Sequence, residues 1–251
     1  FYHKSIEQIR FREQLTQQYG KSFMNHNDTK IGKDYFIMEL EKVHPECCYR
    51  YIDGKRVIQQ TLRSEIRIAD VILPYVQFRH PEFQRILTWF KSQVITETKG
   101  SITDVNCTIN GFKYNFGTGG IHGSITNEIV RSSDTHMIID ADVSSMYPNI
   151  AIANNISPAH LGETFCVVYK DLYEQRKQYA KGTPENAMLK LALNGVYGDS
   201  NNQYSPFYDP QYTMSITING QLLLCMLAEL LMMIPSMRVL SVNTDGICCY
   251  I

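Results

Sequence analysis

The sequence predicts an α+β fold with an antiparallel sheet, a helical insertion and a mainly helical N-terminal part. Helical periodicity dominates residues 1–100, and alternating strand patterns begin near residue 105. Two paired helical segments then separate an apolar strand near residue 140 from a strand–turn–strand close to residue 251. With 251 residues, 44% of them hydrophobic, the chain can bury one large core or two smaller ones.

Three helices are expected in the N-terminal part. The first covers SIEQIRFREQLTQQYG and stops at Gly20, and the second begins near Asp28. A polar, turn-rich stretch around Asp53-Gly54 follows. The third helix starts at Pro81, which suits a first helical turn. Its buried stripe is expected to contain Phe83, Ile86, Leu87, Phe90 and Val94.

Strand patterns follow. The segment DVNCTINGFKYNF alternates, and Asn110-Gly111 at its centre predicts a two-residue hairpin turn. The glycine-rich turn GTGGIHGS comes next, where backbone can approach a ligand closely. The segment THMIIDAD is expected to form a buried strand, followed by a short helix from Ser145 to Asn154.

The remaining elements are helices and a final hairpin. Two helices, VYKDLYEQRKQYAKG and PENAMLKLALNGVYG, are expected to join at Gly182, with Pro184 opening the second. A long apolar helix, roughly Met214 to Ile234, precedes the strand–turn–strand RVLSVNTDGICCYI. No apolar run reaches the roughly 18 residues that a membrane span needs, so no membrane partner is expected.

Composition limits the class of protein. Seven cysteines without zinc-type spacing indicate free thiols in a reducing cytosol, most of them small core residues. The chain begins within a helical pattern and ends within a strand pattern, so we interpret it as an excerpt of a longer polypeptide. Residues 1–100 carry 16 basic and 12 acidic residues, whereas residues 101–251 carry 8 and 13. The acidic part contains Asp140, Asp142 and Asp245, as a region that recruits Mg²⁺ would.

Three residues are candidates for binding divalent cations and phosphate groups. Asp142 follows an apolar strand, Asp245 lies at the turn of the last hairpin, and Lys190 lies on a helix between them. Two converging carboxylates can hold a pair of hard divalent cations, and a nearby lysine can hold the phosphates those cations bridge. Taken singly, a strand-end aspartate, a turn aspartate and a solvated helix lysine are ordinary features.

The segment around Asp142 carries the first resemblance. DVSSMYP resembles motif A of family B DNA polymerases, D-x-x-S-L-Y-P, with Met146 in the leucine position. The resemblance implies that Asp142 and Val143 bind metal and that the following residues meet the incoming nucleotide. The implied nucleotide-binding residues of this segment are Ser144, Ser145, Met146 and Tyr147. Tyr147 is expected to be the steric gate against a 2′-OH.

The helix segment KLALNGVYG resembles motif B of the same family, K-x-x-x-N-S-x-Y-G. Lys190, Asn194, Tyr197 and Gly198 match, and Gly195 stands where the family usually has serine. The resemblance implies that Lys190 and Asn194 bind the nucleotide, while Tyr197 and Gly198 contact the nascent base pair or the primer–template. Arg176, Lys177 and Lys181 on the preceding helix resemble the basic fingers residues, and Arg176 is assigned to the triphosphate.

The segment VNTDG resembles motif C, usually D-T-D-S in a β-hairpin. Asn243 replaces the first aspartate and Gly246 the serine, whereas Asp245 matches the indispensable metal ligand. Asn243 and Thr244 are assigned to the primer–template. FGTGGIHG resembles the glycine-rich Y-x-G-G turn that touches template, which assigns that role to Gly119 and Gly120, although Gly117 stands in the place of the aromatic residue. Tyr114 and Phe116 are carried over with this turn.

The resemblance implies a phage-like polymerase fragment with four parts. Residues 1–100 would be the C-terminal part of the exonuclease and linking region, and 101–168 the first part of the palm. Residues 169–198 would be the fingers helices, and 199–251 the second, truncated part of the palm without a thumb. The implied activity is template-directed DNA synthesis with two Mg²⁺ ions, Mn²⁺ being able to substitute. Implied partners are DNA primer–template, dNTPs and replication accessory proteins, in the cytoplasm (the host's, for a phage protein).

Two other functions stay open. Asp140 and Asp142 form a D-x-D at a strand end, which also serves glycosyltransferases that hold a nucleotide-sugar through Mn²⁺. Asn243 motivates the other, a catalytically weak polymerase-like module that only binds DNA.

Overall fold

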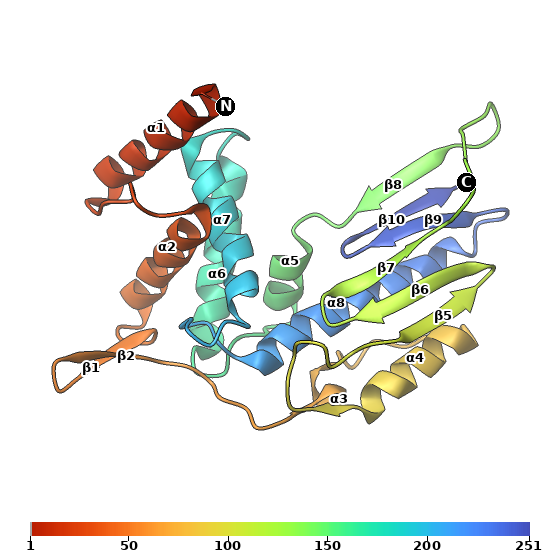
Figure 1. The fold of residues 1–251 in the computed structure, drawn as a ribbon, viewed down its shortest axis with the longest axis horizontal. Helices are drawn as coiled ribbons and strands as arrows, with labels where there is room; N and C mark the ends of the chain where they lie inside the picture. Colours follow the sequence, from red (N-terminus) through yellow and green to blue (C-terminus); the bar gives the residue numbers. More distant parts are fainter. Residues whose placement is uncertain (1) are drawn as a thin grey trace. The chain divides into compact units, whose positions relative to one another are not determined.

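The computed structural model describes residues 2–251 and confirms the α+β class. The contacts between residues divide the chain into two compact units. Figure 1 shows the chain coloured along the sequence. The helical unit comprises the chain up to Thr61 together with Ser157–Tyr208. The sheet unit comprises Leu62–Ile156 and Asp209–Ile251. These units do not follow the boundaries expected at residues 100, 168 and 198, and the division into exonuclease-linked region, palm and fingers stays a prediction.

The helical unit contains four helices and one hairpin within its described residues. Their bounds are Tyr2–Tyr19 (α1), Asp28–Val43 (α2), Tyr49–Ile52 (β1), Lys55–Ile58 (β2), Gly162–Gln178 (α6) and Pro184–Asp199 (α7). Side-chain caps fix two of the helix starts, because Asn27 accepts a hydrogen bond from the Lys30 amide and Thr183 accepts one from the Asn186 amide. Pro184 occupies the first turn of α7, as predicted.

Helix α2 packs directly on α7. Gly32 of α2 faces the backbone of Leu191 and Ala192, so closely that a side chain on Gly32 would overlap the Leu191 carbonyl oxygen. The buried Phe36 ring lies next to the rings of Phe165 (5.5 Å between centroids), Tyr169 (5.4 Å) and Phe207 (5.5 Å). This core holds the helix that carries the motif-B-like residues.

The sheet unit is built on six antiparallel strands in the order β5-β6-β7-β9-β10-β8. The strands are Val105–Ile109 (β5), Phe112–Gly117 (β6), Gly120–Ser124 (β7), Ile138–Asp142 (β8), Arg238–Asn243 (β9) and Gly246–Tyr250 (β10). A two-stranded sheet of Ile66–Arg67 (β3) and Val94–Ile95 (β4) accompanies them. The helices are Ile68–Val71 (α3), Pro81–Ser92 (α4), Met146–Ala153 (α5) and Pro210–Leu231 (α8).

Turn chemistry explains the hairpins of this sheet. Asn110 and Gly111 both have positive φ, 51° and 80°, which is the backbone of a two-residue hairpin turn and confirms the prediction for β5–β6. The hairpin β9–β10 also forms where it was expected. Asp53 and Gly54, with φ of 50° and 73°, form the same kind of turn between β1 and β2, a hairpin that the sequence analysis had read as a polar stretch.

One face of the sheet is covered by helices. Helix α8 packs against β7 and β10, and α4 packs against β5 (Figure 1). Alternate residues of β6 point into this core, where Tyr114 lies 5.1 Å from Phe83 and Phe116 lies 5.9 Å from Phe90 between ring centroids. The alternation places the other residues of each strand on the opposite face, which is polar.

Helix α8 is long and apolar enough to cross a membrane by length and composition, which the sequence analysis had excluded. Its most apolar 18-residue window is 67% buried inside the structure. The core helix of a globular domain has the same length, composition and burial. The helix begins at a buried cap, because the Asp209 carboxylate accepts hydrogen bonds from the Gln211 amide and from Arg63.

Three further expectations were wrong. Strand β8 was predicted to be buried, but every residue of it is exposed, because it lies at the edge of the sheet. Val94 was assigned to the buried stripe of α4, but the helix ends at Ser92 and Val94 lies 54% exposed in β4. Lys181 was placed on the helix before motif B, but α6 ends at Gln178 and Lys181 lies in the turn to α7.

The cysteines follow the prediction within the described residues. All seven are free thiols, and six of them are buried.

The contact between α2 and α7 gives a stability test. Gly32→Ala should lower the free energy of unfolding by about 1–3 kcal/mol, because the new methyl group has to push the two backbones apart. The matched control is Gly195→Ala on α7, whose new methyl group would meet only the Thr29 carbonyl oxygen at 3.9 Å. That control should raise the free energy of unfolding by up to about 1 kcal/mol, because alanine favours helix over glycine. Equal effects of the two substitutions in urea unfolding would contradict this packing.

Candidate functional site

The sheet places the two predicted carboxylates side by side. Asp142 is the last residue of β8, and its Cα partner on β10 is Gly246, the residue that follows Asp245. The backbone continues this contact beyond the strand, because the Val143 N–H donates to the Asp245 carbonyl oxygen at 2.8 Å. Asp142 and Asp245, about a hundred residues apart in the chain, therefore meet at one corner of the sheet.

The negative charge of Asp142 affects the pKa of Asp245. Burial and, next, the negative charge of Asp142 raise the pKa of Asp245 above its usual value. The site is partly open, since Asp142 is exposed and Asp245 is half-buried. A divalent cation next to both carboxylates would offset the repulsion that Asp142 exerts on the ionised Asp245.

The donor set fits a hard cation. Carboxylate and carbonyl oxygens are the ligands that Mg²⁺ and Mn²⁺ prefer, and a magnesium site usually takes only one or two carboxylates plus water and substrate phosphates. Within the described part of the chain there is no cluster of three or more His, Cys, Asp or Glu side chains that could hold a metal ion. Asp142 and Asp245 thus form a two-carboxylate site, with Val143 between them as the expected carbonyl ligand.

Gly246 leaves room for the Asp142 carboxylate. A Cβ on Gly246 would lie 3.3 Å from Asp142 Oδ1 and 3.5 Å from the Ala141 carbonyl oxygen, closer than most such contacts. The replacement of serine by Gly246, which the sequence analysis noted as a departure from motif C, therefore opens a gap directly beside Asp142.

Asn243 lies across that gap and is held by a histidine. Its Cα partners are Gly246 on β10 and His122 on β7, so the side chains of these positions share the polar face. His122 Nδ1 lies 3.0 Å from Asn243 Oδ1, and the Thr244 hydroxyl donates to the same oxygen at 3.4 Å. An amide oxygen only accepts, so His122 carries the hydrogen on Nδ1 in this arrangement.

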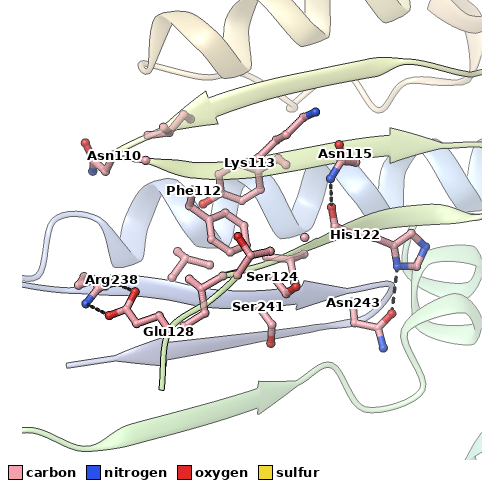
Figure 2. A pocket seen from close by; sticks show the side chains of 18 of the residues that line it. Asn110, Phe112, Lys113, Asn115, His122, Ser124, Glu128, Arg238, Ser241 and Asn243 are labelled. Carbon is pink, nitrogen blue, oxygen red and sulfur yellow. Dashed lines mark hydrogen bonds and ion pairs between the residues drawn. The ribbon is translucent and has the colours of Figure 1, made fainter. Parts of the chain in front are cut away.

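This contact changes the role of Asn243. The sequence analysis found Asn243 in the place of the first aspartate of motif C, and an asparagine retains one side-chain oxygen there. Both acceptor positions of that oxygen are occupied by His122 and Thr244. Figure 2 shows the amide nitrogen of Asn243 on the side away from His122. Asn243 therefore presents hydrogen-bond donors to the polar face instead of a metal ligand.

The turn after Asp142 is sharp. Ser145 has a positive φ of 50°, an uncommon conformation for a residue other than glycine, and α5 begins at the next residue. The Asn149 side chain stabilises the turn by donating to the Ser144 carbonyl oxygen at 2.9 Å. Met146 is buried and Tyr147 half-buried in the first turn of α5, so the nucleotide residues expected from motif A directly follow the Asp142 corner.

The glycine-rich turn contacts the Asp245 turn. Gly120 packs against Thr244, whose Cα and Oγ1 would each lie 3.5 Å from a Cβ at Gly120. The Thr244 N–H donates to the Ile121 carbonyl oxygen at 2.9 Å. Gly119, at the tip of the turn, is exposed. Tyr114 and Phe116, which were carried over with this turn, are instead buried in the core below the sheet.

The motif-B-like residues belong to the helical unit. Lys190, Asn194 and Gly198 are exposed and follow one another at four-residue intervals on α7, so they line one face of the helix, with the half-buried Tyr197 beside them. On α6, Lys177 pairs with Glu174 at 2.8 Å. Within the side chains that the structure describes, Arg176 and Lys190 have no ion-pair partner.

A cavity of about 950 Å³ borders the corner at Asn243 and His122 (Figure 2). Strands β6, β7 and β9 form most of its wall, and the ion pair of Arg238 with Glu128 (2.8 Å) lies at its far end. Polar side chains that line it are Lys113, Asn115, His122, Ser124, Ser241 and Asn243. Sequence reasoning missed His122 and this surface, because only the register of β7 against β9 brings His122 to Asn243.

No known protein-family model matches this chain, and a search of curated proteins finds no match either. The function is therefore inferred from the geometry of the site and from the motif resemblances.

The gap at Gly246 gives the first test of the site. Gly246→Val should weaken Mn²⁺ binding by about tenfold or more, because its branched side chain extends beyond a Cβ that already lies 3.3 Å from Asp142 Oδ1 and would displace this carboxylate. Titration followed by electron paramagnetic resonance measures the affinity. Gly198→Val, whose Cβ would meet nothing within 4 Å, is the control and should bind Mn²⁺ as the unaltered chain does. Unchanged affinity in Gly246→Val would show that the cation lies elsewhere.

The paired carboxylates give a second test. Asp142→Asn should lower the pKa of Asp245, because one of the two causes that raise it is removed. The charged Asp245 is disfavoured in the folded chain, so the substitution should raise the free energy of unfolding at neutral pH. That gain should shrink as the pH falls through the pKa of Asp245, since a protonated carboxyl group is not repelled by Asp142. Carbon-detected NMR titration and urea unfolding measure the two quantities.

Asp140→Asn is the control for this test. The Asp140 carboxylate is not among the causes of the Asp245 shift, so the pKa of Asp245 should stay where it is. An Asp245 pKa that moves equally in both variants would refute the direct coupling to Asp142.

Proposed function

We propose that this chain is part of a family B DNA polymerase and that its sheet unit is the palm. The activity is template-directed transfer of a nucleotidyl group from a dNTP to a primer 3′-OH. The observation that carries the proposal is the pairing of β8 with β10, which joins Asp142 and Asp245 in one corner of an antiparallel sheet. The three motif resemblances, in the family's order, support the same activity.

In this proposal the two carboxylates hold the metal ions. Asp142 and Asp245 supply negative charge, with the Val143 carbonyl as a further oxygen. Bound Mg²⁺ ions would lower the pKa of the primer 3′-OH and neutralise the triphosphate and the leaving pyrophosphate. Burial and the charge of Asp142 raise the pKa of Asp245, and a cation bound by both carboxylates would offset their repulsion.

Residues outside the carboxylate pair have positioning roles in the proposal. The turn at Ser144 and Ser145 leads into α5, whose Tyr147 would block a 2′-OH on the incoming sugar. By the resemblance, Lys190 and Arg176 add positive charge to the triphosphate and Tyr197 packs under the nascent base pair. These three residues lie in the helical unit.

The polar face beside the corner suits a nucleic-acid strand. The cavity contains Lys113 and Asn115, whose side chains can donate hydrogen bonds to phosphate oxygens. The donors of Asn243 extend this surface up to the carboxylates. We place the primer strand there, and the partners of the chain in this proposal are primer–template DNA and dNTPs.

The D-x-D arrangement remains as the other enzymatic candidate. Asp140 and Asp142 are two residues apart on β8, so their side chains share one face, and both are exposed. A glycosyltransferase of this type would require both carboxylates. The polymerase requires Asp142 and Asp245, so the two functions differ in whether they need Asp140 or Asp245.

Primer extension with radiolabelled dNTPs and Mg²⁺ separates them. Asp245→Ala should reduce extension to background, because the remaining carboxylate alone cannot hold both ions. Asp140→Ala should keep extension within about threefold of the unaltered protein, since the two-ion mechanism assigns no metal ligand to this exposed side chain. Loss of nucleotide-sugar hydrolysis in Asp140→Ala, with Asp245→Ala still active, would establish the glycosyltransferase. Metal-dependent DNA binding without extension in the full-length protein would establish the binding module.

A further inference from the structure

Three consecutive residues of α8 contact three different elements of the sheet unit. Asn219 bonds to the segment after α3, Gly220 packs against α5, and Gln221 bonds to the end of β6. Asn219 and Gln221 are fully buried, 0% and 1% exposed. Buried amides without partners cost free energy, so the positions of their partners are strongly specified.

Gln221 binds both backbone polar groups of one residue, Gly117. Its Nε2 donates to the Gly117 carbonyl oxygen at 2.9 Å, and its Oε1 accepts from the Gly117 N–H at 3.2 Å. This is the pattern by which one strand pairs with another, here supplied by a side chain. Gly117 is the last residue of β6 and pairs with Gly120 across the glycine-rich turn.

The turn that Gln221 holds is in contact with the Asp245 turn. Gly120 packs against Thr244, and Thr244 bonds through its N–H to Ile121. Thr244 directly precedes Asp245. Gln221 is therefore connected to the Asp245 carboxylate through two turns. These two turns contact each other through backbone atoms and Thr244.

Gly220 supports the segment that carries the other carboxylate, Asp142. A Cβ there would lie 3.1 Å from the Met146 Cε atom and 3.7 Å from Ile150 Cδ1, so the side chains of α5 pack directly on α8 at this glycine. Met146 begins α5, four residues after Asp142. Adjacent residues of α8 thus support the segment after Asp142 directly and the Asp245 turn through the glycine-rich turn (Figure 1).

We propose that α8 sets the spacing of Asp142 and Asp245, and that Gln221 is a positioning residue for the cation site. This inference rests on the proposed function, since it assigns the carboxylates to a divalent cation. Without the Gln221 amide, the Gly117 N–H and carbonyl lose these two hydrogen bonds, and the two paired turns lose their attachment to α8. A carboxylate displaced by about an ångström no longer completes the coordination.

Asn219 provides a matched control on the same helix. Its Nδ2 donates to the Val71 carbonyl oxygen at 2.7 Å, and its Oδ1 accepts from the Leu73 N–H at 2.9 Å. The geometry and burial resemble those of Gln221, but the bonded segment carries no residue of the site. Gln221→Met and Asn219→Leu each remove two such hydrogen bonds with little change in side-chain volume.

The experiment measures Mn²⁺ affinity and backbone hydrogen exchange in both variants of the full chain. Both variants should unfold at lower temperature. Gln221→Met should weaken Mn²⁺ binding by about tenfold or more, as loss of an outer support of a metal site does, and should speed exchange of the Thr244 amide. Asn219→Leu should leave both quantities within about twofold of the unaltered chain, because non-neighbouring sites are independent.

The outcomes separate the two proposals. If Gln221→Met and Asn219→Leu change Mn²⁺ affinity and Thr244 exchange alike, the positioning role of Gln221 is wrong. If the unaltered chain binds no Mn²⁺ while Gln221→Met alone speeds Thr244 exchange, the proposed function fails and the link from Gln221 to the Asp245 turn stands. Should Gln221→Met not fold, Gln221→Asn replaces it, since its amide is one methylene too short to reach the Gly117 N–H and carbonyl. Unchanged Mn²⁺ affinity in Gln221→Asn would then refute the positioning role of Gln221.

Discussion

The register of β8 against β10 is the constraint on which the candidate site depends. Because Asp142 pairs with Gly246, the carboxylates of Asp142 and Asp245 lie on neighbouring strands at one corner of the sheet. A shift of one residue would turn Asp142 to the other face, away from the polar surface. The backbone bond between the Val143 N–H and the Asp245 carbonyl oxygen extends the pairing past the strand end and helps to fix this register.

The strand that carries Asp142 is itself weakly supported. It lies at the sheet edge and all its residues are exposed, so little side-chain burial holds it. Its position comes instead from backbone pairing with β10 and from α5, which follows it and packs on α8 through Met146. On the other strand pair, Asp245 is tied to the core through Thr244, the glycine-rich turn and Gln221. The buried helix α8 is therefore the common support of two carboxylates that come from distant parts of the chain.

Much of this fold follows from local patterns. Asn110-Gly111 predicts its hairpin, and the starts of α4 and α7 follow from Pro81 and Pro184, because turn and cap chemistry acts over a few residues. Burial of β8 could not be predicted, since the apolar run MIID looks the same in a central strand and at an edge. For the site, Asp142 and Asp245 were predictable as a pair, and the structure brings them together. His122 and Gln221 were not, because their partners Asn243 and Gly117 are more than a hundred residues away and only strand register and helix packing bring them near.

The central claim is that Asp142 and Asp245 together hold divalent cations. Crystals of the chain soaked in Mn²⁺ test it most directly through anomalous scattering at the manganese edge. The account predicts at least one strong peak about 2.2 Å from carboxylate oxygens of both residues, the distance expected for oxygen ligands of a small divalent ion. Well-occupied Mn²⁺ peaks elsewhere on the chain, with none between these two side chains, would contradict it.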